Sequence, residues 1–280
     1  MRLLPAVADL PAIEAHEHLV LGPSDVHIWR YEFNVGASLG CTKVFRELLS
    51  PDELDRLARL RDEQSRQQFV AGRALCRWVL SRYAPVRPED WRFELGSRGK
   101  PSIADPVVPS PLWFSLSHAK GISVCAVTGA GPNIGIDLER VDSATDYLEI
   151  ASQFFPEVET NALRRLPPDQ QSDAFIRTWV LKESFAKARE TSLADGFAGT
   201  AFHLGENGDI GVTFMAPLDE LTENWQFRML RLDRNLIFAL SVRTQSIEPL
   251  RLRTAQCIPI QRQRLGSRAH LLRGSSFRFA

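Results

Sequence analysis

The chain has 280 residues, of which 44% are hydrophobic, and this is enough to bury the core of one or two domains. Acidic and basic residues are equal in number, so the net charge of zero gives no indication of a nucleic-acid partner. Charge is nevertheless uneven, because residues 246–280 carry seven arginines and a single acidic residue, Glu248.

The cysteines lie far apart and form no CxxC pair, so we expect neither a zinc site nor a disulfide framework. They are Cys41, Cys76, Cys125 and Cys257. Prolines and acidic residues interrupt the N-terminal segment, which is not typical of a signal peptide. No stretch approaches the roughly 20 apolar residues of a membrane span. We therefore expect a cytoplasmic protein without a membrane span.

In the first half of the chain, strands precede and follow two helices. Residues 25–33 alternate polar and apolar side chains, as a half-buried strand does. Ser50, Pro51 and Glu53 predict a helix start, with the helix continuing to about residue 58. A second helix is predicted over 62–83, ahead of two prolines. Further strands are predicted at 91–95, 112–118 and 122–128, the last two as a hairpin.

The second half follows a glycine-rich connector at 129–133 and partly repeats this order. We predict a strand at 134–141 and a helical region over about 143–190. Strands are then expected near 198–204, 209–215, 225–232 and 235–243. Strands and helices do not alternate regularly, so the fold class is α+β. The similar order on both sides of the connector suggests a duplicated architecture.

The strand at 134–141 carries the most informative acidic pair. Alternate residues of a strand share a face, so Asp137 and Glu139 lie side by side. Two neighbouring carboxylates repel each other unless a cation lies between them, and Mg²⁺ prefers such oxygen ligands. Gly135 would allow a ligand or another backbone to come close. The simpler interpretation is a solvated strand face.

The helical segment 175–187 offers a third carboxylate. Trp179, Glu183 and Lys187 follow one another at four-residue steps and therefore share a face. Glu183 is a candidate metal ligand or base, and Lys187 is a candidate cation for a phosphate. An ordinary surface ion pair is the alternative for this segment alone.

Two further segments have groups that suit phosphates. Ser117 and His118 end a predicted strand and have hydrogen-bond donors. The turn at 98–101 places two cations around a glycine, followed by a stiffening proline. A strand-end histidine bonded to backbone and a basic surface turn are the alternatives.

Taken in order, these segments resemble the Sfp-type 4′-phosphopantetheinyl transferase family. The motifs are R-x-x-F-x-x-G-R-x-L-x-R (66–77), R-G-K-P (98–101), F-S-L-S-H (114–118), I-G-I-D-L-E (134–139) and W-x-x-K-E-S-F-x-K (179–187). The resemblance covers residues 40–205 by motif and extends to about residue 243 by layout. It implies a pseudo-dimer of two similar α/β halves that binds coenzyme A between them. The halves would be 1–129 and 133–245, with 246–280 as a basic, mobile tail.

The resemblance also implies roles for individual residues. Mg²⁺ would be held by Asp137, Glu139 and Glu183. Coenzyme A would contact Arg56, Arg73, Arg98, Gly99, Lys100, Pro101, Ser117 and His118.

The implied reaction is that of a holo-[acyl-carrier-protein] synthase. Glu183, directly or through water, would take the proton from a serine of an apo acyl or peptidyl carrier protein. That serine would attack the phosphate that bears pantetheine, and Lys187 would stabilise or protonate the departing 3′,5′-ADP. Carriers of fatty acid, polyketide or nonribosomal peptide biosynthesis all remain open. We expect a monomer and no nucleic-acid partner.

Two departures from the family pattern bear on this reading. Glu190 and Ser192 stand where relatives often have glycines, which affects loop shape. Glu53 precedes Arg56 where relatives often have basic phosphate contacts. The rival hypothesis is a non-catalytic module that binds coenzyme A or a carrier protein, and the intact acidic residues argue against it.

Overall fold

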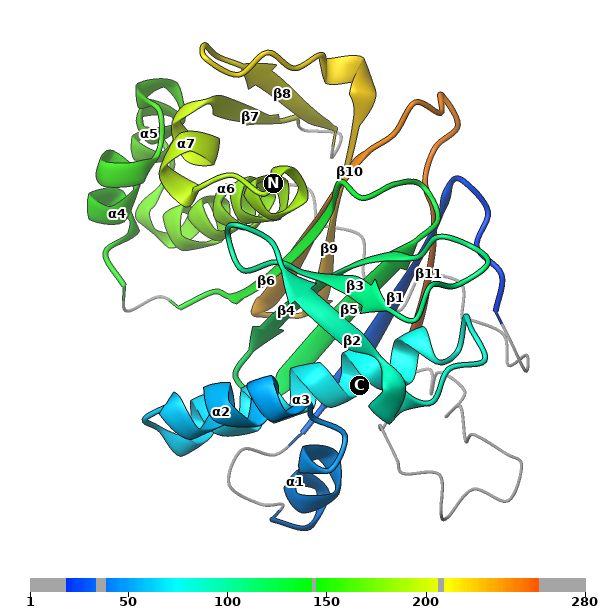
Figure 1. Cartoon of the computed structure of the whole chain (residues 1–280). Helices are drawn as coiled ribbons and strands as arrows, with labels where there is room; N and C mark the ends of the chain where they lie inside the picture. Colours follow the sequence, from blue (N-terminus) through cyan, green and yellow to red (C-terminus); the bar gives the residue numbers. More distant parts are fainter. Residues whose placement is uncertain (1–18, 34–38, 143–144, 206–208, 257–280) are drawn as a thin grey trace, which may run out of the picture. The chain divides into compact units, whose positions relative to one another are not determined.

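The computed structural model describes residues 19–33, 39–142, 145–205 and 209–256. Contacts divide the chain into two compact units. Among the described residues, the N-terminal unit comprises 19–95, 101–129 and 250–256, and the C-terminal unit comprises 96–100 and 130–249. Both contain strands and helices without regular alternation (Figure 1), so the α+β class is confirmed.

The N-terminal unit contains a four-stranded sheet in the order β11-β1-β5-β4 and a separate pair, β2 and β3. Its strands are β1 (Asp25–Glu32), β2 (Arg92–Leu95), β3 (Pro101–Asp105), β4 (Trp113–Ala119), β5 (Ile122–Thr128) and β11 (Arg251–Gln256). β1 runs antiparallel to β5 and parallel to β11. β4 and β5 pair antiparallel with His118 opposite Ser123, which confirms the predicted hairpin.

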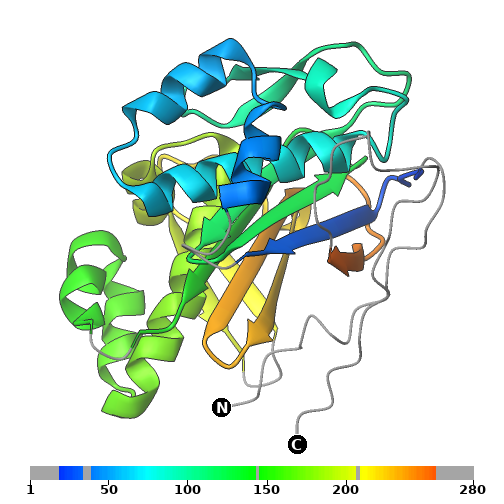
Figure 2. The same ribbon diagram turned by 90° about the horizontal axis from the view of Figure 1, so that it is seen from below.

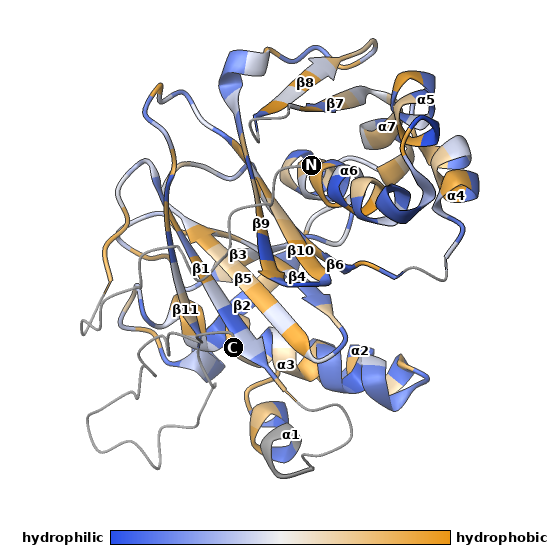
Figure 3. Cartoon of the chain, turned by 180° about the vertical axis from the view of Figure 1, so that it is seen from behind, coloured by the Kyte–Doolittle hydropathy of each residue, from blue (hydrophilic) through white to orange (hydrophobic). Residues whose placement is uncertain are grey.

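The helices of the N-terminal unit are α1 (Leu39–Arg46), α2 (Pro51–Arg59), α3 (Glu63–Leu80) and the short 3₁₀ helix η2 (Pro88–Asp90). The predicted start at Ser50 is confirmed: its hydroxyl accepts from the Glu53 amide, and the Glu53 carboxylate accepts from the Ser50 amide. α3 packs against β5 and β4 (Figure 2). In Figure 3, α2 is mostly hydrophilic and β5 mostly hydrophobic, in keeping with an exposed helix and a buried strand.

A buried histidine in β1 gives the N-terminal unit a predicted sensitivity to acid. His27 is 5% exposed, and its Nδ1 lies 2.8 Å from the Tyr83 hydroxyl. Burial lowers the pKa of His27 to about 4; the charge of Asp25 opposes this shift, and the charge of Arg253 adds to it. An unfolded histidine titrates near 6.5, so stability should fall as pH drops below 6.5 toward 4.

From pH 7 to pH 5, this group should cost the folded chain about 2 kcal/mol. Urea unfolding of the chain and of His27→Gln at both pH values measures this cost. The variant should lose much less stability over that interval. The same loss in both proteins would show that His27 is not responsible.

The C-terminal unit is built on an antiparallel sheet in the order β6-β10-β9, with a hairpin of β7 and β8 beside it. Its strands are β6 (Ile134–Arg140), β7 (Thr200–Leu204), β8 (Ile210–Phe214), β9 (Trp225–Asp233) and β10 (Leu236–Arg243). Its helices are α4 (Tyr147–Phe154), α5 (Glu157–Arg164), α6 (Pro168–Arg189), α7 (Leu193–Ala198) and the 3₁₀ helix η3 (Thr222–Asn224). The longest helix, α6, packs on β6 and β10 (Figure 1).

The structure adds detail that the sequence pattern did not predict. The helical region expected over 143–190 contains three helices, because Pro156 and Pro167 stand at the starts of the second and third. The helices α1 and α7 and the strands β3 and β11 were not predicted. β11 lies within the segment expected to be a mobile tail, and its backbone pairs with β1 instead. Residues 257–280 lie outside the described residues.

The pseudo-dimer and the boundaries at 129, 133 and 245 stay predictions. Each unit does lay one long helix, α3 or α6, against antiparallel strands. Among the described residues, no helix is both long enough and apolar enough to cross a membrane.

Candidate active site

The acidic face of β6 is covered by a helix rather than by solvent. Asp137 is 3% exposed and Glu139 is half-buried, while Ile136 and Leu138 are buried in the alternate positions. The interpretation of a solvated strand face is therefore wrong for Asp137. A carboxylate removed from water needs compensating charge or hydrogen bonds.

Gly135 explains how the helix comes so close. A Cβ atom placed on Gly135 would lie 2.6 Å from the amide nitrogen of Ala188 and 2.9 Å from the carbonyl carbon of Ser184, both in the backbone of α6. Only glycine permits this approach. The Ser184 and Ser241 hydroxyls bond at 2.7 Å and join α6 to β10, opposite Gly135 in the sheet. Two buried contacts thus fix α6 over β6.

This packing brings the final lysine of α6 to the aspartate of β6. Lys187 Nζ donates to Asp137 Oδ1 at 2.6 Å and to the Ile136 carbonyl at 3.3 Å. Burial lowers the pKa of Lys187, but the charges of Asp137, Glu183 and Glu139 outweigh this and raise it overall. The ammonium group is therefore firmly protonated.

The two glutamates complete a cluster with excess negative charge. Burial raises the pKa of Glu139 to about 7, and the charges of Asp137 and Glu183 add to the effect. Burial also raises the pKa of Glu183 to about 7, with Asp137 contributing and Lys187 opposing. The described chain thus places three carboxyl groups close to the ammonium group of Lys187, and a further cation would stabilise their ionised forms.

The donor set suits a divalent cation such as Mg²⁺, which prefers carboxylate oxygens. As the side chains lie, however, no three His, Cys, Asp or Glu groups of the described chain converge closely enough to hold a metal ion. Asp137 Oδ1 accepts a hydrogen bond from the Lys187 ammonium group, which supplies positive charge at that oxygen. The chemistry and charge of the cluster fit a metal, whereas ligation requires the side chains to rearrange.

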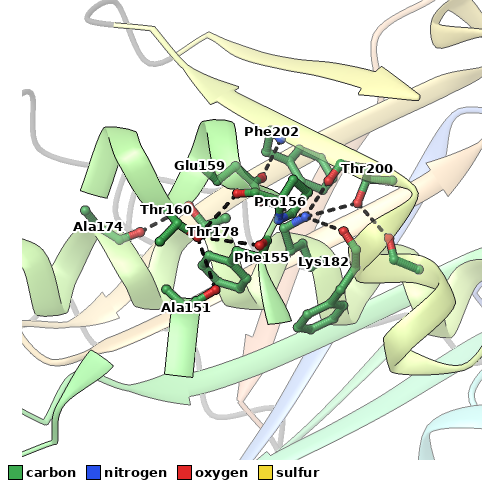
Figure 4. Close-up of polar contacts among 12 residues, drawn as sticks. Ala151, Phe155, Pro156, Glu159, Thr160, Ala174, Thr178, Lys182, Thr200 and Phe202 are labelled. Carbon is green, nitrogen blue, oxygen red and sulfur yellow. Dashed lines mark hydrogen bonds and ion pairs between the residues drawn. The ribbon is translucent and has the colours of Figure 1, made fainter. Parts of the chain in front are cut away.

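The neighbouring lysine of the same motif has a different environment. Lys182 is fully buried, and Figure 4 shows its ammonium group pointing between Glu159 and the start of β7. It pairs with Glu159 Oε2 at 2.8 Å and donates to the carbonyls of Phe197 at 2.9 Å and Thr200 at 2.5 Å. Lys182 therefore fixes α6 to α5, α7 and β7 and takes no part in the acidic cluster.

The R-G-K-P turn lies between β2 and β3, and residues 96–100, which include its first three members, group with the C-terminal unit. Arg98 is exposed, and Gly99 has a φ of 78°, the left-handed region that a tight turn requires of glycine here. Lys100 Nζ donates to the Pro132 carbonyl at 3.0 Å and lies 3.7 Å from Glu190. Pro101 begins β3 in the N-terminal unit.

The remaining residues expected to bind coenzyme A belong to the N-terminal unit. Ser117 is buried and His118 exposed at the end of β4. Arg73 is 8% exposed, with Nε 3.4 Å from the Glu53 carboxylate and its guanidinium over the ring of Phe69. Arg56 is exposed and lies over the same ring.

The structure gives Glu53, an acidic residue where relatives often have basic phosphate contacts, a structural role. Its carboxylate pairs with Arg73 and, at 2.6 Å, with the fully buried Arg77. This acidic residue therefore holds α2 to α3. Arg73 serves the same pairing, so its proposed contact with coenzyme A has a structural competitor.

Some residues that hold α6 in place were not indicated by any sequence motif. Glu159 lies far from Lys182 in sequence, and no spacing pointed to it. Ser241 and Asn133 were missed for the same reason, although Asn133 donates to the Ala188 carbonyl near the end of α6 at 3.1 Å. The glycine in I-G-I-D-L-E was the one available signal for close packing, and it proved informative.

Comparisons with known proteins are consistent with this site. The model of the 4′-phosphopantetheinyl transferase superfamily matches residues 133–240, which include the whole acidic cluster. The 4′-phosphopantetheinyl transferase HetI of a Nostoc strain is 34% identical over 226 residues, covering 80% of this chain and 90% of HetI. The transferase Sfp of Bacillus subtilis is 30% identical over 60% of this chain and 72% of its own length. The mouse L-aminoadipate-semialdehyde dehydrogenase-phosphopantetheinyl transferase is 28% identical over 70% of this chain and 67% of its own.

Proposed function

Because this chain belongs to the 4′-phosphopantetheinyl transferase superfamily, we propose that its acidic cluster and Lys187 carry out a metal-dependent transfer. The chain transfers the 4′-phosphopantetheine arm of coenzyme A to a carrier protein. The observation that best supports a site at Asp137, Glu139 and Glu183 is the close crossing of α6 over Gly135. It gathers three carboxyl groups and one ammonium group around the end of a single helix.

Each residue has a distinct proposed role. Asp137, Glu139 and Glu183 would hold Mg²⁺, which when bound would neutralise charge on the pyrophosphate of coenzyme A. Glu183 takes the proton from the carrier serine, directly or through water. The serine oxygen forms a bond to the phosphorus that bears pantetheine, while the bond to the 3′,5′-ADP oxygen breaks. Lys187 stabilises that oxygen or gives it a proton.

The finer assignments form part of the same proposal. Lys100, in the R-G-K-P turn, would contact the nucleotide portion of coenzyme A, as would Arg98, Ser117 and His118. The chain would act as a monomer in the cytoplasm, with the specificity of a holo-[acyl-carrier-protein] synthase. Its acceptors would be apo acyl or peptidyl carrier proteins.

Intact-protein mass spectrometry tests the activity directly. An apo carrier protein incubated with the chain, coenzyme A and Mg²⁺ should gain one phosphopantetheine arm, and EDTA should prevent the gain. Glu183→Gln should slow the reaction by about 10²- to 10⁴-fold, since it removes a base and a ligand together. Glu157→Gln, which changes an exposed residue of α5, is the matched control.

Three outcomes would contradict parts of this proposal. A gain that persists in EDTA would exclude the metal requirement. Normal rates with Glu183→Gln would exclude that residue as base. No gain with fatty-acid, polyketide or peptide carriers, while coenzyme A still binds, would favour the non-catalytic module.

A further inference from the structure

The residue that follows α6 has an unusual backbone. Glu190 has φ 55° and ψ 39°, the left-handed region, and it is the one non-glycine residue of the described chain with positive φ. Glycine is common where a helix ends in this way, because any side chain is strained there. Such strain persists only where the surroundings hold it, and it justifies a search for a local function.

The side chain of Glu190 lies against the R-G-K-P turn. One carboxylate oxygen is 3.7 Å from Lys100 Nζ, and a Cβ atom on Gly96 would collide with the same carboxylate. Gly96 in turn accepts a hydrogen bond from the Gly99 amide and donates its own amide to the Lys100 carbonyl. The turn is therefore shaped around the Glu190 carboxylate.

The side chains of Lys100 and Glu190 differ in how firmly each is held in this ion pair. The side chain of Lys100 is 12% exposed and is also held by the Pro132 carbonyl at 3.0 Å. The side chain of Glu190 is 41% exposed, and 3.7 Å exceeds the length of a strong charge-assisted hydrogen bond. Burial lowers the pKa of Lys100, and Glu190 opposes this. The ammonium is the fixed partner and the carboxylate the displaceable one.

The same helix end has a second ammonium group three residues earlier. Lys187 is tightly bonded to Asp137 at 2.6 Å, in contrast to the loose pair of Lys100 with Glu190. An anion that approaches Lys100 must replace or repel a carboxylate already there. Like charges brought close together oppose binding, and more so where water is partly excluded.

We propose that Glu190 is a built-in competitor for Lys100, whose carboxylate must move away before a phosphate of coenzyme A can pair with that ammonium group. The inference rests on the proposed function, because that function assigns Lys100 to coenzyme A. It makes Glu190 a determinant of coenzyme A affinity. The bond-forming step at the acidic cluster does not involve it, so Glu190 should affect KM for coenzyme A and leave kcat unchanged.

Calorimetric titration of the full chain with coenzyme A and with 3′,5′-ADP tests the proposal. Glu190→Gln keeps the length of the side chain and removes its charge, and it should tighten binding of both ligands about 5-fold. The KM for coenzyme A should fall similarly. Glu157→Gln changes net charge equally at an exposed site of α5 and should leave both affinities unchanged.

A second variant places the effect on the lysine. In the background of Lys100→Met, Glu190→Gln should give no gain in affinity, because the ammonium group for which the carboxylate and the phosphate compete is absent. Equal or weaker binding by Glu190→Gln would overturn the proposal and make Glu190 a residue that positions Lys100. A gain that survives Lys100→Met would also overturn it.

The binding measurement separates this proposal from the proposed function. If both ligands bind more tightly to Glu190→Gln but no carrier is modified, only the proposed function fails. If carriers are modified and the affinities do not change, only the competition fails. If the chain and the variant bind neither ligand, both are wrong.

Discussion

Gly135→Ala is expected to lower the free energy of unfolding by about 3 kcal/mol and to remove most transfer activity. The added methyl group would lie within 3 Å of backbone atoms of Ser184 and Ala188, and backbone cannot turn aside as a flexible side chain can. α6 must therefore move away from β6. That movement breaks the bond between Lys187 and Asp137 and separates Glu183 from the carboxylates of β6.

Gly72→Ala is the matched control for this prediction. Gly72 lies inside α3, and the nearest described atom to an added Cβ there is Ser123 Oγ at 3.9 Å, an ordinary contact. Replacing a helical glycine by alanine should raise stability by up to about 1 kcal/mol. Urea unfolding and carrier modification measure both variants. If Gly135→Ala is as stable and active as the parent chain, the close crossing of α6 does not build the site.

Much of the secondary structure of the C-terminal unit could be predicted, because it depends on the spacing of residues that are close together in the sequence. The alternation around Asp137 predicted β6, and the four-residue steps from Trp179 to Lys187 predicted one face of α6. Periodicity reports which side chains share a face. It does not report what covers that face, so the burial of Asp137 under α6 came only from the structure.

The features that escaped prediction depend on contacts distant in sequence. β11 pairs with β1 across more than 200 residues, and its arginines made the segment resemble a solvated tail. Glu190 was noted as a replaced glycine, but its pairing with Lys100 required the turn to lie beside the end of α6. The strained backbone of Glu190 and its ion pair with Lys100 produce no periodic pattern in the amino-acid sequence.

Lys182→Met should be among the most destabilising single substitutions in the C-terminal unit, at about 3–5 kcal/mol. The variant fills the space of the lysine but leaves the buried Glu159 carboxylate with the Phe202 amide, at 2.7 Å, as its one remaining hydrogen-bond donor among the described residues. Removing one member of a buried ion pair exposes the full desolvation cost of the other. Urea unfolding at pH 7 measures the loss.

The pH dependence and a second substitution distinguish loss of charge from loss of packing. Burial already raises the pKa of Glu159 and lowers that of Lys182, so the pair persists because its hydrogen bonds and mutual attraction oppose burial. Without Lys182, the pKa of Glu159 rises further in the folded state, and stability should decrease as pH rises above the ordinary glutamate value of 4.5. Glu159→Gln added to Lys182→Met should recover part of the loss and abolish that pH dependence, as a coupled pair requires. The loss in free energy of unfolding is also measured for Glu159→Gln alone. If the loss in the double variant equals the sum of the losses in the two single variants, Lys182 stabilises α6 through packing alone.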